Sequence, residues 1–171
     1  MASLLAKLLI TYEALKLPPP TATVLLRGQG PSADIPGTNC GLFATPVFNM
    51  AGLDCRRSLE FFGLTCNYKT NHLEPITMKR RTDDLGIEHF GLAMVTPAQF
   101  IGVASTVISV PLEPILIQVH NWTNKELAHF TISQPTMTYQ SIRNMSVAMI
   151  EAYMQLLFDA LGRPRPSINP C

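Results

Sequence analysis

The sequence has few charged side chains. They make up 15% of the 171 residues, against about 25% in an average soluble protein. The charges also nearly cancel, with 13 basic and 12 acidic side chains. Proteins that bind nucleic acid by neutralising phosphates carry an excess of positive charge. We therefore expect no strong nucleic-acid binding, and we expect a low-charge exterior that favours association.

Cysteine is also sparse, with 4 in the whole chain, too few for a disulfide framework in a chain of this length. This predicts reduced thiols in a cytosol-like compartment. No pair has the Cys-x-x-Cys spacing of a structural zinc site. Cys55 falls on the apolar face of a predicted helix, where a small buried side chain explains it. We expect neither a metal nor a cofactor.

No long apolar run is present. Residues 2–17 are mostly apolar, but the run stops at Pro18 and is too short to span a bilayer. Lys7, Glu13 and Lys16 lie within it, which is a poor match to a secretory signal peptide. The sequence therefore predicts no transmembrane helix and allows at most a peripheral membrane contact.

Catalytic and nucleotide-binding signatures are missing as well. The sequence has no Gly-x-Ser-x-Gly elbow, Walker loop or His-Glu-x-x-His motif. Residues 28–33 (GQGPSA) match the letters of a dinucleotide fingerprint. However, Pro31 removes an amide, and a turn follows where the fingerprint needs a helix. We expect a protein that is not an enzyme.

The chain has the length of one domain. We divide it into an N-terminal helix with a proline-rich arm (residues 1–20) and a single α+β domain (residues 21–171). The N-terminal helix has a broad apolar side and is stopped by three prolines. It either docks on its own core or reaches a neighbouring copy or a membrane. In the second case its contact residues are Leu5, Leu8, Leu9 and Tyr12.

Two further helices are predicted. One begins with Thr45 as N-cap and Pro46 at its first position and ends before Gly63. The other covers residues 141–161 and is apolar on nearly every side, more than we expect one domain of this size to cover. This excess predicts contacts between copies of the chain. The expected contact residues are Met149, Tyr153, Met154 and Leu157.

The β part is predicted between residues 99 and 139. Residues 100–110, 115–120 and 126–133 are rich in β-branched side chains and are joined by short links. Residues 21–27 and 65–69 are short candidate strands. The expected fold class is α+β, with an antiparallel β-meander sheet packed by two or three helices.

Residues 70–91 lack an apolar period and carry many charges, which predicts a long surface loop. Lys79, Arg80 and Arg81 form the densest positive cluster of the chain and suit phosphates or anionic lipid headgroups. Asp83 and Asp84 follow directly and weaken the field of this cluster. A solvated loop is therefore the alternative interpretation.

His120 and His129 lie on neighbouring predicted strands. If they face each other, they suit a metal site or a proton switch. A structural pair is the simpler interpretation. An enzyme or ligand-binding protein that uses these two histidines and the loop 70–91 remains a minority hypothesis.

The layout resembles that of small rhabdovirus matrix proteins. The resemblance rests on residues 1–9 (MASLLAKLL), the proline-rich connection PPPT at 18–21, and residues 59–64 (LEFFGL). It implies a non-enzymatic, self-associating viral protein of the virion that lies between nucleocapsid and envelope. Two features depart from that family. Only Lys7 and Lys16 remain of its lysine-rich N-terminal segment, and no Pro-Pro-x-Tyr motif is present.

The favoured function is a structural, self-assembling, matrix-like protein that forms homo-oligomers. The alternative is an accessory subunit of a large membrane-associated or organellar complex, such as a mitochondrial one, which uses the same surfaces on unlike partners. Both place the protein in a reducing compartment or at the periphery of a membrane.

Overall fold

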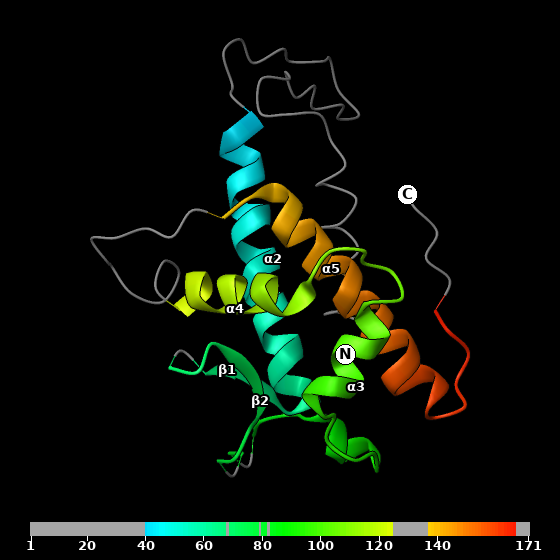
Figure 1. Cartoon of the computed structure of the whole chain (residues 1–171). Helices are drawn as coiled ribbons and strands as arrows, with labels where there is room; N and C mark the ends of the chain where they lie inside the picture. The colour runs from blue at the N-terminus through cyan, green and yellow to red at the C-terminus, as the bar shows by residue number, and fades with distance from the viewer. Residues whose placement is uncertain (1–39, 68, 79, 82, 125–136, 167–171) are drawn as a thin grey trace.

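The computed structural model describes residues 40–67, 69–78, 80–81, 83–124 and 137–166 (Figure 1). Within these ranges the chain forms four α-helices and a two-stranded antiparallel sheet. The predicted α+β class is confirmed. The predicted N-terminal helix and arm (1–20) and the predicted strands at 21–27 and 126–133 lie outside the described residues.

Helix α2 (Cys40–Phe62) is the longest described element. It begins five residues before the predicted N-cap, Thr45, and it ends at Phe62 as predicted. Gly63 follows with φ of 86° and donates its N–H to the carbonyl of Glu60 at 3.0 Å. Glycine accepts this left-handed conformation without the steric cost that a side chain brings.

One face of α2 forms the middle of the core, as its amphipathic pattern predicts. Phe48, Ala51, Cys55, Leu59 and Phe62 are all buried on this face. Burial raises the pKa of the Cys55 thiol to about 12, with a smaller opposing effect from its contact with Ser146. Cys55 is therefore a buried apolar residue, as its position on the helix predicts.

A hairpin follows α2 directly. Strands β1 (Leu64–Asn67) and β2 (His72–Pro75) pair with Leu64 opposite Pro75 and Asn67 opposite His72. The predicted strand at 65–69 therefore exists, shifted by one residue at its start. Asn67 organises the turn, because its side-chain oxygen accepts N–H groups from Lys69 and Thr70 while its amide nitrogen donates to Glu74. β2 and the short 3₁₀ helix η1 (Ile87–Phe90) lie inside the segment predicted as one irregular loop.

The predicted meander is wrong in its first two strands, which are helices. Residues 100–110 contribute to α3 (Pro97–Ala104), and residues 115–120 lie in α4 (Leu112–Trp122). α3 starts with a capping box, in which the Thr96 hydroxyl accepts the N–H of Gln99 at 3.3 Å and Gln99 accepts the N–H of Thr96 at 2.9 Å. The first N–H groups of a helix have no carbonyl partner within the helix, and this reciprocal pair satisfies two of them. The pair is therefore a local signal for a helix start.

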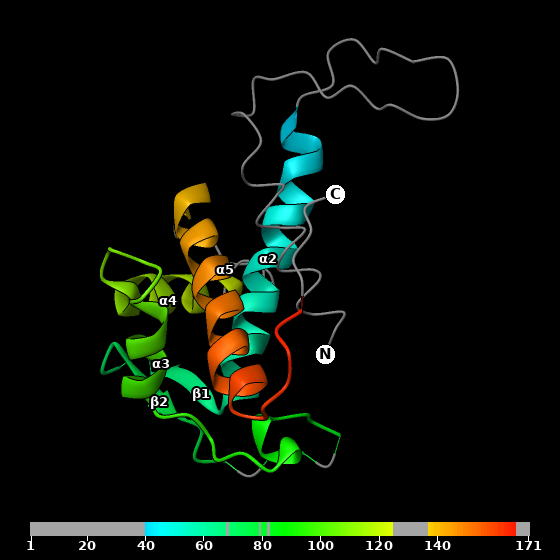
Figure 2. The ribbon, with the colours of Figure 1, turned by 90° about the vertical axis from the view of Figure 1, so that its right-hand side faces the viewer.

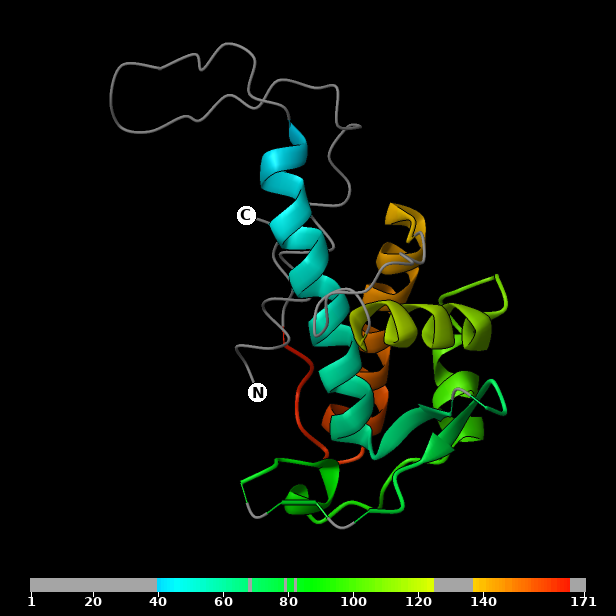
Figure 3. The same ribbon diagram turned by 90° about the vertical axis from the view of Figure 1, so that its left-hand side faces the viewer.

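The chain closes with α5 (Tyr139–Tyr153), which continues into the π-helical turn η3 (Met154–Asp159). α5 and α2 lie side by side and run in the same direction, and α4 crosses them (Figures 1 and 2). α3 lies against α5 on the side of the hairpin, and the N-terminal turns of α2 project beyond the other helices (Figure 3). No helix in the described part of the chain is long and apolar enough to span a membrane.

The sides of α5 are covered by the chain's own elements, since α2, α3 and α4 all contact it. Tyr153 meets Phe62 with ring centroids 4.9 Å apart, and Phe62 in turn meets Phe100 at 5.9 Å. The expectation that one domain of this size cannot cover this helix is therefore wrong for most of its apolar surface, although some large apolar side chains stay only partly buried, namely Val147, Ile150, Leu156, Phe158 and Leu161. Helices α3 and α4, predicted as strands, provide the additional apolar surface that covers it.

Candidate anion-binding groove

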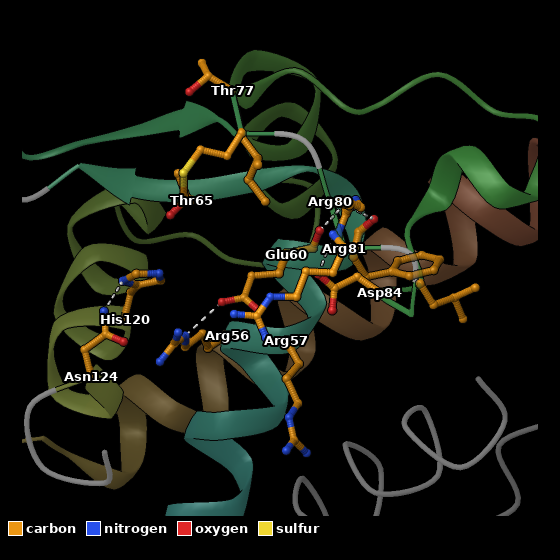
Figure 4. A pocket seen from close by; sticks show the side chains of 14 residues that line it. Arg56, Arg57, Glu60, Thr65, Thr77, Arg80, Arg81, Asp84, His120 and Asn124 are labelled. Atoms are coloured by element: carbon orange, nitrogen blue, oxygen red, sulfur yellow. Dashed lines mark hydrogen bonds and ion pairs between the residues drawn. The ribbon is translucent and has the colours of Figure 1, made fainter. Parts of the chain in front are cut away.

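A groove of about 830 Å³ lies beside the C-terminal half of α2 (Figure 4). One wall comes from α2, another from the loop that follows β2, and the third from the C-terminal end of α4. Its polar lining combines four arginines with two carboxylates and several neutral groups, namely Arg56, Arg57, Arg80, Arg81, Glu60, Asp84, Thr65, Thr77, His120 and Asn124.

Helix α2 presents two adjacent arginines to the groove. The Nε atom of Arg56 donates to the Glu60 carboxylate at 2.9 Å, one helical turn further on. Arg57 has a looser partner, the buried carboxylate of Asp54 at 3.6 Å, and its side chain is 61% exposed. Arg57 therefore keeps donor capacity for a ligand, whereas Arg56 is held by Glu60.

Arg80 has a structural role at the opposite wall. Its Nε atom lies 2.6 Å from the Glu88 carboxylate, and its guanidinium donates to the carbonyls of Glu60 and Phe61. A cation at this position provides partners for carbonyl groups that the end of a helix leaves unsatisfied. The Arg80 side chain is only 14% exposed. Of the predicted anionic contacts, Arg80 is thus used inside the fold.

Arg81 is the exposed arginine of this loop. Its backbone N–H donates to Asp84 at 3.2 Å. Among the described residues, no carboxylate lies within 4.0 Å of its guanidinium. The side chain of Lys79, the third predicted contact, lies outside the described residues. The structure therefore brings Arg81 together with Arg57, a residue 24 positions earlier in the chain.

His120 forms the end of the groove at α4 and is 4% exposed. Its Nδ1 atom lies 3.3 Å from the amide nitrogen of Asn124. Burial lowers the pKa of His120 to about 4, and the positive charge of Arg56 adds to this effect. At neutral pH the ring is therefore uncharged and a weak base. The strand predicted around His120 is wrong, because His120 lies on α4. His129 lies outside the described residues.

Two features named in the minority enzyme hypothesis lie close together, because His120 and residues of the loop 70–91 line the same groove. A nucleophile paired with a base is missing from the described lining, which offers arginines, carboxylates, threonine hydroxyls and a weakly basic histidine. The described residues also contain no group of three or more His, Cys, Asp or Glu side chains that could hold a metal ion. The lining is chemically suited to binding an anion.

The predicted contact residues of the closing helix lie elsewhere, in the core. Met149, Tyr153, Met154 and Leu157 are between 0% and 4% exposed. Their side chains contact the chain's own helices and are not on the surface of the described fold. The N-terminal contact residues, Leu5, Leu8, Leu9 and Tyr12, lie outside the described residues.

Arg56 and Arg57 lie on the face of α2 opposite its buried apolar face, where Arg56 is partly exposed and Arg57 is exposed. Two adjacent arginines opposite an apolar face are a local signal for an exposed basic site. Their proximity to Arg81 has no local signal, because it depends on the hairpin turning the chain back toward the end of α2.

Comparisons of the chain with protein-family models, with curated proteins and with solved structures give no match. The resemblance to rhabdovirus matrix proteins therefore stays a prediction.

Proposed function

We propose that this protein is a non-enzymatic structural protein that assembles with copies of itself at an anionic membrane surface, in the manner of a viral matrix protein. The observation that carries the proposal is the composition of the loop after β2. Positive and apolar side chains are exposed on the same short segment. This combination suits the boundary between lipid headgroups and acyl chains.

The apolar part of this loop consists of Met78 and Leu85. Their exposed fractions are 82% and 52%, and both side chains line the same groove as Arg57 and Arg81. An exposed methionine side chain adds little to the free energy of folding of the isolated protein. Its transfer into lipid is favourable by about 0.8 kcal/mol for each CH₂ group that is buried. The nearby arginines add attraction to anionic headgroups.

Self-association is supported by further exposed apolar side chains and by the low charge of the chain. Large apolar side chains with at least 41% exposure occur on α2 and in the segments between the helices and strands, namely Met50, Met78, Leu85, Met94, Val107 and Val110. A chain with only 15% charged residues has little electrostatic repulsion between copies.

Vesicle co-sedimentation tests the membrane part of the proposal. The full chain is expected to sediment with vesicles that contain phosphatidylserine and to stay in solution with purely zwitterionic vesicles. A double variant, Met78→Ser with Leu85→Ser, should bind about tenfold more weakly, because each side chain loses its apolar contact with lipid. The matched control is Val107→Ser with Val110→Ser, which removes exposed apolar side chains from outside the groove.

Equal binding of wild type and the Met78/Leu85 variant would contradict the role of the loop. Equal binding to anionic and zwitterionic vesicles would contradict the role of the arginines.

A further inference from the structure

We propose that the groove is a binding site for a multiply phosphorylated anion, with Arg57 and Arg81 as its main contacts. This inference rests on the proposed function and deepens it, since it names the headgroup class that the surface would select. The same chemistry occurs on a phosphoinositide headgroup and on a soluble inositol phosphate.

The two available guanidinium groups come from different walls of the groove. Arg57 belongs to α2 and Arg81 to the loop that follows β2. In Figure 4 the Arg81 side chain lies beside Glu60, and the Arg57 side chain extends from α2 away from both. Each has spare donors, because within the described part of the chain the ion-pair partner of Arg57 lies at 3.6 Å and the exposed Arg81 uses its backbone N–H on Asp84. Arginine binds phosphate through paired N–H groups. Two such groups on different elements of one groove suit two phosphates on one ligand.

The size of the groove points to a ligand larger than a single phosphate. A volume of about 830 Å³ lies in the range of about 300–1,000 Å³ that is typical of small-molecule sites. Thr65, Thr77 and Asn124 supply neutral hydrogen-bonding groups along the lining. Such groups suit the hydroxyls of a sugar-like ring between the phosphates.

Glu60 occupies the position of a competing anion. Its side chain is 40% exposed, it lines the groove, and it accepts the Arg56 N–H at 2.9 Å. A bound phosphate near Arg56 would be repelled by this carboxylate. Removing the charge of Glu60 should therefore strengthen anion binding, which is the opposite of the effect of removing an arginine.

The test is isothermal titration of the full chain with soluble inositol trisphosphate at low salt. Arg57→Gln combined with Arg81→Gln should weaken binding by about tenfold or more, because both charge-assisted contacts are lost. Glu60→Gln should tighten binding by roughly threefold to tenfold. Arg163→Gln, which removes an exposed arginine outside the groove, is the matched control and should leave binding unchanged.

A second arm uses vesicles of equal surface charge that contain either phosphatidylinositol bisphosphate or phosphatidylserine. Preference for the bisphosphate, lost in the Arg57/Arg81 variant, identifies the lipid headgroup as the source. Equal vesicle binding together with tight binding of the soluble probe identifies a soluble ligand. The opposite changes in affinity from the arginine and glutamate variants cannot both result from unfolding.

The inference is overturned if the soluble probe does not bind, or if its affinity is the same in wild type and the Arg57/Arg81 variant. If vesicle binding still depends on Met78 and Leu85 in that case, the proposed membrane function is retained and only the headgroup site is rejected.

Discussion

Arg80 and Glu88 form a close ion pair, with 2.6 Å between Nε and the carboxylate oxygen. Arg80 also donates to the last carbonyls of α2. The pair therefore fastens the loop after β2 to the end of α2 and fixes the wall of the groove from which Arg81 projects. Gly86 lies directly against it, because a Cβ atom at this position would come within 2.6 Å of the Arg80 Nε atom.

Gly86→Ala is expected to destabilise the fold by about 1–3 kcal/mol, because the added methyl group forces the ion pair apart. Gly102→Ala is the control, since nothing lies within 4 Å of its Cβ position and it lies within α3. That change should stabilise the fold by about 0.5–1 kcal/mol. Urea unfolding of both variants measures the difference. Equal stability of the two variants would show that the ion pair does not fix the loop.

Two adjacent leucines in η3 test whether the closing helix packs in the core or forms a contact surface. Leu157 is 0% exposed, whereas Leu156 is only partly buried. Leu157→Ala should cost about 2–5 kcal/mol of unfolding free energy, because it leaves a cavity between the helices. Leu156→Ala should cost about half of that or less. If denaturant unfolding of the Leu157 variant matches wild type, its side chain is not in the core.

His120 makes stability depend on pH. Its folded pKa of about 4 lies below its ordinary value of about 6.5. As pH falls from 6.5 to 4, the unfolded chain binds a proton at His120 that the folded chain does not. Stability should therefore fall across this window, by at most about 3 kcal/mol from this residue, and be unaffected by it at higher pH.

His120→Gln should flatten the loss of stability between pH 6.5 and 4 in thermal unfolding, and His89→Gln, at an exposed position, should retain it. A His120 variant that loses stability in this window as steeply as wild type would contradict the account.

The α+β class and the end of α2 at Gly63 were predictable, because a glycine after a periodic apolar face is a strong local signal. The strands predicted at 100–110 and 115–120 are wrong, because isoleucine and valine are compatible with a helix when the preceding residues provide a helix start. The letters Thr96-Pro97-Ala98-Gln99 carry a capping box and a proline at the first helical position. These signals favour a helix more specifically than β-branched content favours a strand.

In α4, spacing was the better guide. Leu112, Leu116, Val119 and His120 are buried at intervals of four, three and one residues, which is a helical period. The side chains of residues 115–120 also fit the two-residue alternation of a strand, because the run is too short to separate the two periods. Helices α3 and α4 also cover the closing helix, so the residues predicted as contacts between copies (Met149, Tyr153, Met154 and Leu157) lie in the core.

The groove itself was only partly predictable. The cluster 79–81 was recognised as positive, but sequence could not show that Arg80 caps α2 while Arg81 stays exposed. That division depends on Glu88 and on the carbonyls of Glu60 and Phe61, which the fold brings to Arg80 from both sides along the chain.

Light scattering of the purified full chain, measured over a wide concentration range at low salt and without any partner, tests self-assembly most directly. We predict a mass that rises with concentration above the 18.8 kDa of one chain. A constant mass of one chain at every concentration would contradict a protein that builds an assembly from its own copies.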